Sequence, residues 1–110
     1  MIAYTLRCNQ CGYVSEVFGD TRDLFHDTYS LIFQQSETRQ IVVREVSATL
    51  LSERAIDRDS PDAHEKIEPC FVEPGERLLR IPMGESMQKI VADCPTCAAQ
   101  SLEKAFCGLF

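Results

Sequence analysis

Two short stretches, Cys8-Asn9-Gln10-Cys11 and Cys94-Pro95-Thr96-Cys97, decide how this chain is interpreted. Each has two residues between its cysteines, a spacing that lets a tight turn aim both sulfurs at one cation while backbone N–H groups point at the thiolates. Gly12 supplies a permissive backbone after the first pair, and Pro95 fixes φ inside the second. We therefore predict one tetrahedral four-thiolate site, the usual arrangement of structural zinc. Its predicted ligands are Cys8, Cys11, Cys94 and Cys97.

The distance between the two pairs indicates an insertion. Paired motifs of this kind are commonly separated by about 15 to 20 residues, whereas 82 residues lie between Cys11 and Cys94. The entropy cost of closing a loop grows only logarithmically with its length, so the long separation is compatible with a single metal site. We expect the metal to hold the two ends of the chain together around additional structure.

An alternative is that the pairs act separately, as buried small hydrophobic residues or as a thioredoxin-like redox motif. A redox pair of this spacing normally begins a helix, whose N-terminus lowers the pKa of the thiol. Here Gly12-Tyr13-Val14 follows the first pair and is typical of a turn that enters a strand. The local pattern favours the metal site.

Composition and charge limit the class of protein. With 110 residues, 45% hydrophobic and 25% charged, the chain has the length and composition of one folded domain. A net charge of -6 disfavours sequence-independent binding to nucleic acid, and four thiolates binding one divalent cation would make the protein more negative. We expect a protein partner, and the oligomeric state stays open.

The compartment is inferred from the start of the chain and from its apolar runs. Residues 1–7 lack the cationic start and apolar stretch of a signal peptide. Runs such as Leu31-Ile32-Phe33 are far shorter than the roughly 18 residues that suggest a membrane span. We therefore expect a reduced, cytoplasmic protein without membrane association, a setting in which cysteines more often bind metal than form disulfides.

Both ends of the chain resemble a known family. Residues 1–18 are similar to the opening of the FmdB-type regulatory zinc-ribbon proteins, whose pattern is aromatic-x-x-Arg-Cys-x-x-Cys-Gly-aromatic-x-x-Glu. The second cysteine pair, followed by Leu102–Phe106, is similar to the second half of that pattern. The resemblance covers about 35 residues and implies metal binding by the four paired cysteines. It departs from the family at Ala98, where the pattern has glycine, and over the whole middle of the chain.

From the spacing and the resemblance together we predict a mainly β, small α+β fold. A rubredoxin-like zinc ribbon, built from residues 1–18 and 88–110, would clasp the termini around an inserted β-rich subdomain of residues 19–87. The expected function is that of a non-catalytic binding module, acting in protein interaction or as a regulatory subunit.

Two alternative functions stay open. The cysteine motifs also resemble rubredoxin, which implies an iron electron carrier, and four-thiolate geometry suits either zinc or iron. A transcription-related zinc ribbon that binds nucleic acid would need a basic face despite the net charge. The candidate residues for such a face are Arg7, Arg22, Arg39, Arg44 and Lys89.

Apolar alternation and β-branched residues predict most of the secondary structure as strands. The expected strands are Ala3–Leu6, Tyr13–Phe18, Tyr29–Phe33, Gln40–Leu51, Cys70–Val72, Leu78–Ile81 and Met87–Ala92. Glu73–Glu76 has the signature of a type II turn, which would join two of these strands into a hairpin. The segment Ala98–Phe106 fits a helix or a strand.

Two helical segments are also expected. Ser60-Pro61-Asp62 is a good helix start, and Pro69 should limit that helix to two turns. A short helical turn is expected over Asp23–His26.

The remaining reactive residues suggest no catalytic site. Cys70 and Cys107 are expected to pack in the core, because unpaired cysteine is among the most buried residue types. His64 should lie on an exposed helix face and His26 near the metal-binding unit or at the surface. The sequence has no nucleophile with an adjacent base and no phosphate loop, and an acidic excess over residues 53–76 is typical of a solvated face.

Overall fold

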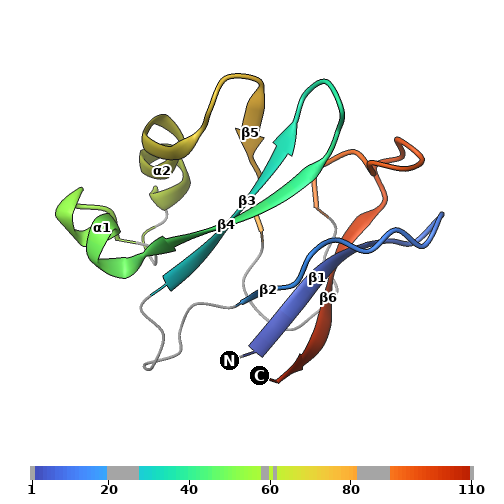
Figure 1. Cartoon of the computed structure of the whole chain (residues 1–110), viewed down its shortest axis with the longest axis horizontal. Coiled ribbons are helices and arrows are strands. Elements are labelled where there is room, and N and C mark those ends of the chain that lie inside the picture. Colours follow the sequence, from blue (N-terminus) through green and yellow to red (C-terminus); the bar gives the residue numbers. More distant parts are fainter. Residues whose placement is uncertain (1, 20–27, 58–59, 61, 82–89, 110) are drawn as a thin grey trace.

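The computed structural model describes residues 2–19, 28–57, 60, 62–81 and 90–109, and within them the fold is mainly β with two short helices (Figure 1). The first sheet has the order β2-β1-β6 and consists of β1 (Ile2–Cys8), β2 (Phe18–Gly19) and β6 (Leu102–Leu109). Strands β1 and β6 run antiparallel from Ile2 opposite Leu109 to Cys8 opposite Leu102. The mainly β class that the sequence predicted is confirmed.

The second sheet lies in the middle of the chain. It has the order β4-β3-β5 and consists of β3 (Thr28–Gln35), β4 (Ile41–Ser47) and β5 (Glu76–Leu78), all antiparallel. A tight connection joins β3 to β4, with the Gln35 N–H donating to the Gln40 carbonyl at 2.9 Å. The polar residues Ser36 to Arg39, between the two predicted strands, are typical of such a connection.

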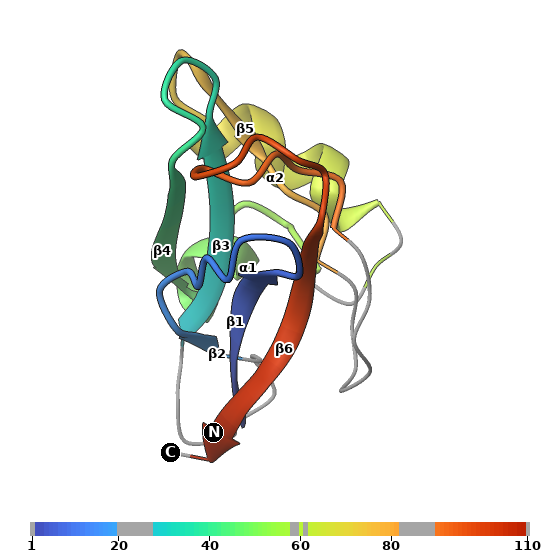
Figure 2. The ribbon, with the colours of Figure 1, turned by 90° about the vertical axis from the view of Figure 1, so that its right-hand side faces the viewer.

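The second sheet separates two hydrophobic clusters. Alternate residues of a strand point to opposite faces, and on β3 Ile32 packs with Tyr4 and Leu102 of the first sheet. Its neighbours Leu31 and Phe33 pack on the opposite face, in the cluster that contains residues of both helices. The molecule therefore has three layers, with the first sheet on one side of β3 and the helices on the other (Figures 1 and 2).

The strand predicted over Gln40–Leu51 ends early, and helix α1 (Ala48–Glu53) follows it directly. Ser47 is the N-cap of this helix, because its side chain accepts a hydrogen bond from the Leu50 N–H at 3.0 Å. Such a cap satisfies a backbone donor that helix formation leaves without a partner. Leu51 then turns into the core beneath the second sheet instead of extending β4.

The helix expected after Ser60 is present but has different bounds. Helix α2 (Ala63–Phe71) begins after Asp62 and continues through Pro69 for two further residues. The hairpin predicted between Cys70–Val72 and Leu78–Ile81 is consequently wrong, because Cys70 and Phe71 are helical. The turn itself is confirmed: Gly75 has a φ of 82°, and the Glu76 N–H donates to the Glu73 carbonyl at 3.2 Å. Strand β5 pairs with β3 instead.

Three predictions concern segments next to the cysteines. The strand expected over Tyr13–Phe18 is reduced to a single bridge between Arg7 and Val14 followed by β2. The ambiguous segment Ala98–Phe106 contributes to β6, and Ile90–Ala92 forms no strand. Met87–Lys89 and the helical turn expected over Asp23–His26 lie outside the described residues.

Candidate metal centre

The first cysteine turn, Cys8–Gly12, follows directly from the end of β1. The Gly12 N–H donates to the Cys8 carbonyl at 3.2 Å, and the Cys8 N–H donates to the Tyr13 carbonyl at 2.9 Å. Gly12 has a φ of 80°, a conformation that residues with a side chain rarely adopt. The backbone of the turn therefore favours glycine at this position.

The second cysteine turn, Cys94–Ala98, repeats the same hydrogen bonds. The Ala98 N–H donates to the Cys94 carbonyl at 2.9 Å, and the Cys94 N–H donates to the Ala99 carbonyl at 2.9 Å. Ala98 occupies the position equivalent to Gly12 and has a φ of 63°. The departure from glycine at this position is thus tolerated by placing alanine in the left-handed region, without a different kind of turn.

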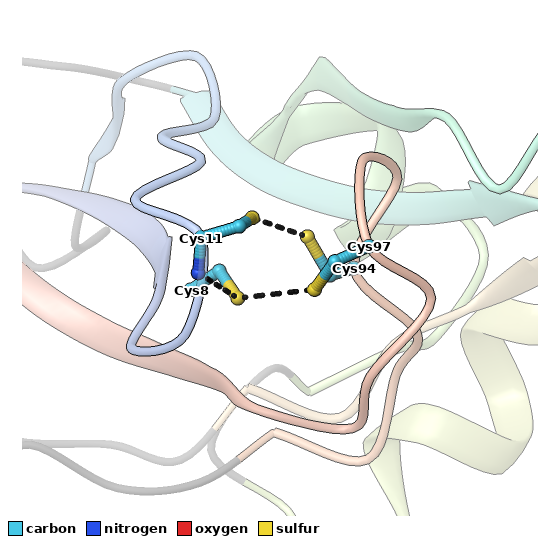
Figure 3. A group of neighbouring side chains, drawn as sticks. All are labelled: Cys8, Cys11, Cys94 and Cys97. Carbon is cyan, nitrogen blue, oxygen red and sulfur yellow. Dashed lines mark hydrogen bonds between the residues drawn. The ribbon is translucent and has the colours of Figure 1, made fainter.

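The two turns face one another and bring four sulfur atoms together (Figure 3). All four Sγ atoms lie within 4.8 Å of one another; Cys8 and Cys97 are 3.7 Å apart, and Cys11 and Cys94 are 3.4 Å apart. Zinc–sulfur bonds of about 2.3 Å in a tetrahedron place the sulfurs about 3.8 Å apart. All four cysteines are free thiols. The cluster can therefore hold one metal ion, and its geometry does not choose between zinc and iron.

The four sulfurs differ in exposure. Cys8 and Cys94, the first cysteine of each turn, are buried, whereas Cys11 and Cys97 are exposed. Cys8 is buried because β1 ends there, opposite Leu102 of β6. The cluster consequently has one side against the core of the first sheet and the other side toward solvent.

Besides the neighbouring Cys97 sulfur, the Cys8 sulfur has three hydrogen-bond partners. They are the Ser101 hydroxyl at 2.9 Å and the backbone N–H groups of Gln10 at 3.4 Å and Cys11 at 3.5 Å. The hydrogen bond with Ser101 is the main cause that lowers the pKa of Cys8 to about 6; burial opposes it, and the two backbone groups add to it. Cys8 therefore carries negative charge more readily than an ordinary cysteine does.

The pKa of Cys11 moves in the opposite direction. The backbone at Tyr13 lowers it, but desolvation of the sulfur and the neighbouring Cys94, Cys8 and Cys97 raise it to about 12. Burial and the charge of Cys94 likewise raise the pKa of Tyr13. Like charges at these distances repel strongly, so four thiolates can share this space only if a cation neutralises them.

A buried amide connects the second cysteine turn to the second sheet. Gln34 of β3 donates through Nε2 to the carbonyls of Asp93 at 2.6 Å and Arg39 at 3.1 Å. Its Oε1 accepts hydrogen bonds from the Asp93 N–H at 3.2 Å and from the Arg77 guanidinium at 3.0 Å. Because Asp93 immediately precedes Cys94, this side chain fixes where the second turn begins.

Sequence reasoning missed both Ser101 and Gln34. Neither belongs to a motif: Ser101 reaches the site through the pairing of β1 with β6, and Gln34 reaches it through its side-chain hydrogen bonds with Asp93. The sequence of β3 contains one signal for Gln34. Because side chains alternate between the two faces of a strand, the polar Gln34 lies on the same face as the buried Ile32.

The other candidate residues that the structure describes do not belong to the cluster. Cys70 and Cys107 are exposed, so the prediction that they pack in the core is wrong. His64 is half-buried, and its Nε2 lies 3.1 Å from the Glu68 carboxylate on the same helix. His26, Arg22 and Lys89 lie outside the described residues.

The charged residues of the middle segment are extensively paired. Arg44, a candidate for a basic face, contacts the Glu76 carboxylate at 2.6 Å and that of Glu73 at 3.5 Å. Further pairs join Glu65 to Arg80, and Asp62 to Lys66 at 3.4 Å. Two arginines from outside residues 53–76, Arg44 and Arg80, therefore compensate part of the acidic excess of this segment.

Comparisons with models of protein families, with curated proteins and with solved structures found no match to this chain. No helix among the described residues has the length and apolar content that a membrane crossing requires.

Proposed function

We propose that the protein is a non-catalytic, zinc-ribbon-like binding module in which one structural zinc ion closes the ends of the chain. The observation that carries this proposal is the meeting of four sulfurs, two from each end of the sequence, within 4.8 Å. The ion would be held by Cys8, Cys11, Cys94 and Cys97, and it would supply cross-linking and charge neutralisation.

The closed ligand set supports a structural and not a catalytic role. Catalytic zinc sites usually keep one position open for water or substrate, whereas four protein ligands fill a tetrahedral zinc. The proposed arrangement is the rubredoxin-like clasp predicted from the sequence. Its resemblance to FmdB-type zinc ribbons rests on the sequence of residues 1–18, the second cysteine pair and Leu102–Phe106.

Cysteine alkylation in the presence and absence of a chelator tests the ligand set. The protein is purified under reducing conditions, treated with N-ethylmaleimide, and analysed by peptide mass spectrometry together with elemental analysis. Exposure alone predicts rapid labelling of four exposed cysteines, namely Cys11, Cys70, Cys97 and Cys107. Metal binding predicts that only Cys70 and Cys107 label in the loaded protein, and that Cys11 and Cys97 join them after chelation.

The same preparation decides between the metals. We expect one zinc per chain and a colourless protein. One iron per chain, with visible sulfur-to-iron charge-transfer absorption, would support the alternative of an electron carrier. Labelling of Cys11 and Cys97 before chelation, with no bound metal, would contradict any metal site.

A protein partner is the second part of the proposal. The net charge of -6 and the ion pairs of Arg44 count against a nucleic-acid surface. Large exposed hydrophobic residues occur next to both cysteine turns in the sequence, as expected for an interaction surface. They are Val14 and Val17 after the first turn and Val91 before the second.

Affinity purification from the native host, with and without nuclease, tests this part. We expect a co-purifying protein that nuclease treatment does not release and that Val91→Glu weakens. Val91 is 76% exposed, so this change should leave folding intact, which circular dichroism checks. A complex lost on nuclease treatment, or lost steeply with salt, would favour the nucleic-acid alternative.

We also propose that the protein lies in the cytoplasm, where thiols stay reduced. Cell fractionation tests this compartment.

A further inference from the structure

Ser101 lies directly before β6 and beside the first cysteine turn. Because Cys8 pairs with Leu102 in the first sheet, residue 101 lies level with the point where β1 ends. The Ser101 carbonyl accepts a hydrogen bond from the Asn9 N–H at 3.2 Å, and its hydroxyl oxygen lies 2.9 Å from the Cys8 sulfur. Ser101 therefore contacts the first turn through its backbone and its side chain together.

The chemistry of a bound cysteine decides the direction of the Ser101–Cys8 hydrogen bond. A metal ligand cysteine is a thiolate, which has no proton to donate. The hydroxyl must then be the donor, and the sulfur the acceptor. Ser101 is 4% exposed and Cys8 is 2% exposed, so water does not compete for either atom. Hydrogen bonds to a charged acceptor are stronger than neutral ones, especially where water is excluded.

We propose that Ser101 is a positioning residue of the metal site, whose hydroxyl orients the Cys8 thiolate toward the metal and stabilises its charge. The inference rests on the proposed metal site. It assigns a role to a residue outside both cysteine pairs, and it makes the start of β6 part of the centre. Loss of a group that orients a metal ligand typically lowers metal affinity about 10- to 100-fold.

Three substitutions of Ser101 separate the hydroxyl from the shape of the side chain. Ser101→Ala removes the hydroxyl, whereas Ser101→Thr keeps it. Ser101→Val has the shape of threonine without the hydroxyl. The matched control is Ser30→Ala, because Ser30 is also a buried serine that forms a hydrogen bond, with the Gly19 N–H at 3.2 Å, but it lies in the second sheet away from the cysteines.

Two measurements on the full chain report on the site. Competition with a chromophoric chelator measures affinity for Zn²⁺, and Co²⁺ loading shows the sulfur-to-cobalt charge-transfer band. We expect Ser101→Ala to lower zinc affinity about 10-fold. Without the hydrogen bond the sulfur keeps more electron density, so the cobalt band should move to lower energy. Ser101→Thr should restore both values, and Ser30→Ala should change neither.

The possible outcomes separate this proposal from the metal site itself. Unchanged affinity and band position in Ser101→Ala, or an equal loss in Ser30→Ala, would overturn the role of Ser101. If Ser101→Ala does not fold, the comparison of Ser101→Thr with Ser101→Val tests the role of the hydroxyl. Equal zinc affinity and equal band position in these two variants would also overturn that role. If the wild-type protein binds neither Zn²⁺ nor Co²⁺, the proposed function fails, and this inference fails with it.

Discussion

Gly12 and Ala98 occupy equivalent positions in the two cysteine turns, with φ angles of 80° and 63°. The left-handed conformation costs a residue with a Cβ roughly 1–2 kcal/mol, a cost that glycine does not incur. No atom lies within 4 Å of a Cβ built on Gly12, so the cost there is conformational and not a clash. The two cysteine turns therefore have the same backbone conformation, but that conformation costs more free energy at Ala98 than at Gly12.

Exchanging the two residue types tests this comparison. Gly12→Ala should lower the free energy of unfolding of the metal-loaded protein by about 1 kcal/mol. Ala98→Gly should raise it by about 0.5 kcal/mol, because the relief of strain exceeds the entropy that glycine adds to the unfolded chain. Urea denaturation at a fixed free zinc concentration measures both. Destabilisation by Ala98→Gly would show that Ala98 contributes packing that outweighs its backbone strain.

The protons released on zinc binding should depend on pH. The pKa of Cys8 is lowered to about 6, so at pH 7 this residue is already a thiolate, and at pH 5 it must lose a proton to bind metal. Cys11, with a pKa raised to about 12, releases its proton at either pH. We therefore expect about one additional proton per zinc at pH 5. Titration calorimetry in buffers of different ionisation enthalpy measures this number, and equal release at both values would contradict the assignment.

At the scale of elements, Arg44 connects the two outer strands of the second sheet. It extends from β4 across the central strand, with its guanidinium 4.6 Å from the centre of the Phe33 ring. Both of its terminal nitrogens reach the Glu76 carboxylate of β5 at 2.6 Å. Since β5 has only three residues, this pair supplements a short ladder of backbone hydrogen bonds.

The Arg44–Glu76 pair makes a pH-dependent contribution to stability. Hydrogen bonds from Arg44 are the main cause that lowers the pKa of Glu76. The stabilisation is therefore complete above the unfolded pKa of about 4.3 and is lost as the pH falls through the lower, folded pKa. We expect Glu76→Gln to lower the free energy of unfolding by about 1–2 kcal/mol at pH 7, and the difference from wild type to narrow below pH 4.

Glu73→Gln is the matched control for this pair. Its carboxylate lies 3.5 Å from Arg44 and is 71% exposed, so its removal should change stability by less than about 0.5 kcal/mol. Urea denaturation between pH 3 and 7 provides the comparison. If the loss in free energy of unfolding caused by Glu76→Gln were the same at every pH in this range, the variant would have lost packing and not a charge interaction.

Local patterns predicted some elements well and others poorly. The hairpin of β3 and β4 was predictable because apolar and β-branched residues on both sides of a polar turn favour strands. Helix α1 was missed because Thr49, Leu50 and Leu51 continue the strand pattern, and only the capping side chain of Ser47 marks the change. The pairing of β5 with β3 was missed because a tight turn usually joins two strands that pair with each other. The segment before this turn, however, forms the end of α2.

At the scale of the whole molecule, the four cysteines could be predicted from sequence because each pair fixes its own turn. Ser101 and Gln34 could not, because their positions depend on the register of β1 with β6 and on the packing between the two sheets. Gln34 also shows that the second cysteine turn is anchored by the middle of the chain. The predicted boundaries between ribbon halves and insertion stay a prediction, and one hydrophobic cluster contains residues from both.

Removal of the metal should destabilise the whole chain. Structural zinc sites contribute their binding free energy to folding, and both cysteine turns contact the packed sheets through Cys8 and Asp93. We expect chelation, or Cys8→Ser with Cys94→Ser, to lower the free energy of unfolding by at least about 5 kcal/mol. Cys70→Ser with Cys107→Ser is the control, since both residues are exposed. An unchanged melting temperature after chelation would contradict the structural role of the metal.

The pairing of β1 with β6 has a consequence for synthesis on the ribosome. Ile2 lies opposite Leu109, so β1 must wait until β6 has been made before the ladder between these two strands can form. Contacts so distant in sequence slow folding, and until β6 has been made the apolar residues of β1 have no neighbour on that side. The second sheet, whose strands all lie between residues 28 and 78, can assemble earlier. The nascent chain would therefore fold from its middle outward, with metal capture as its final step.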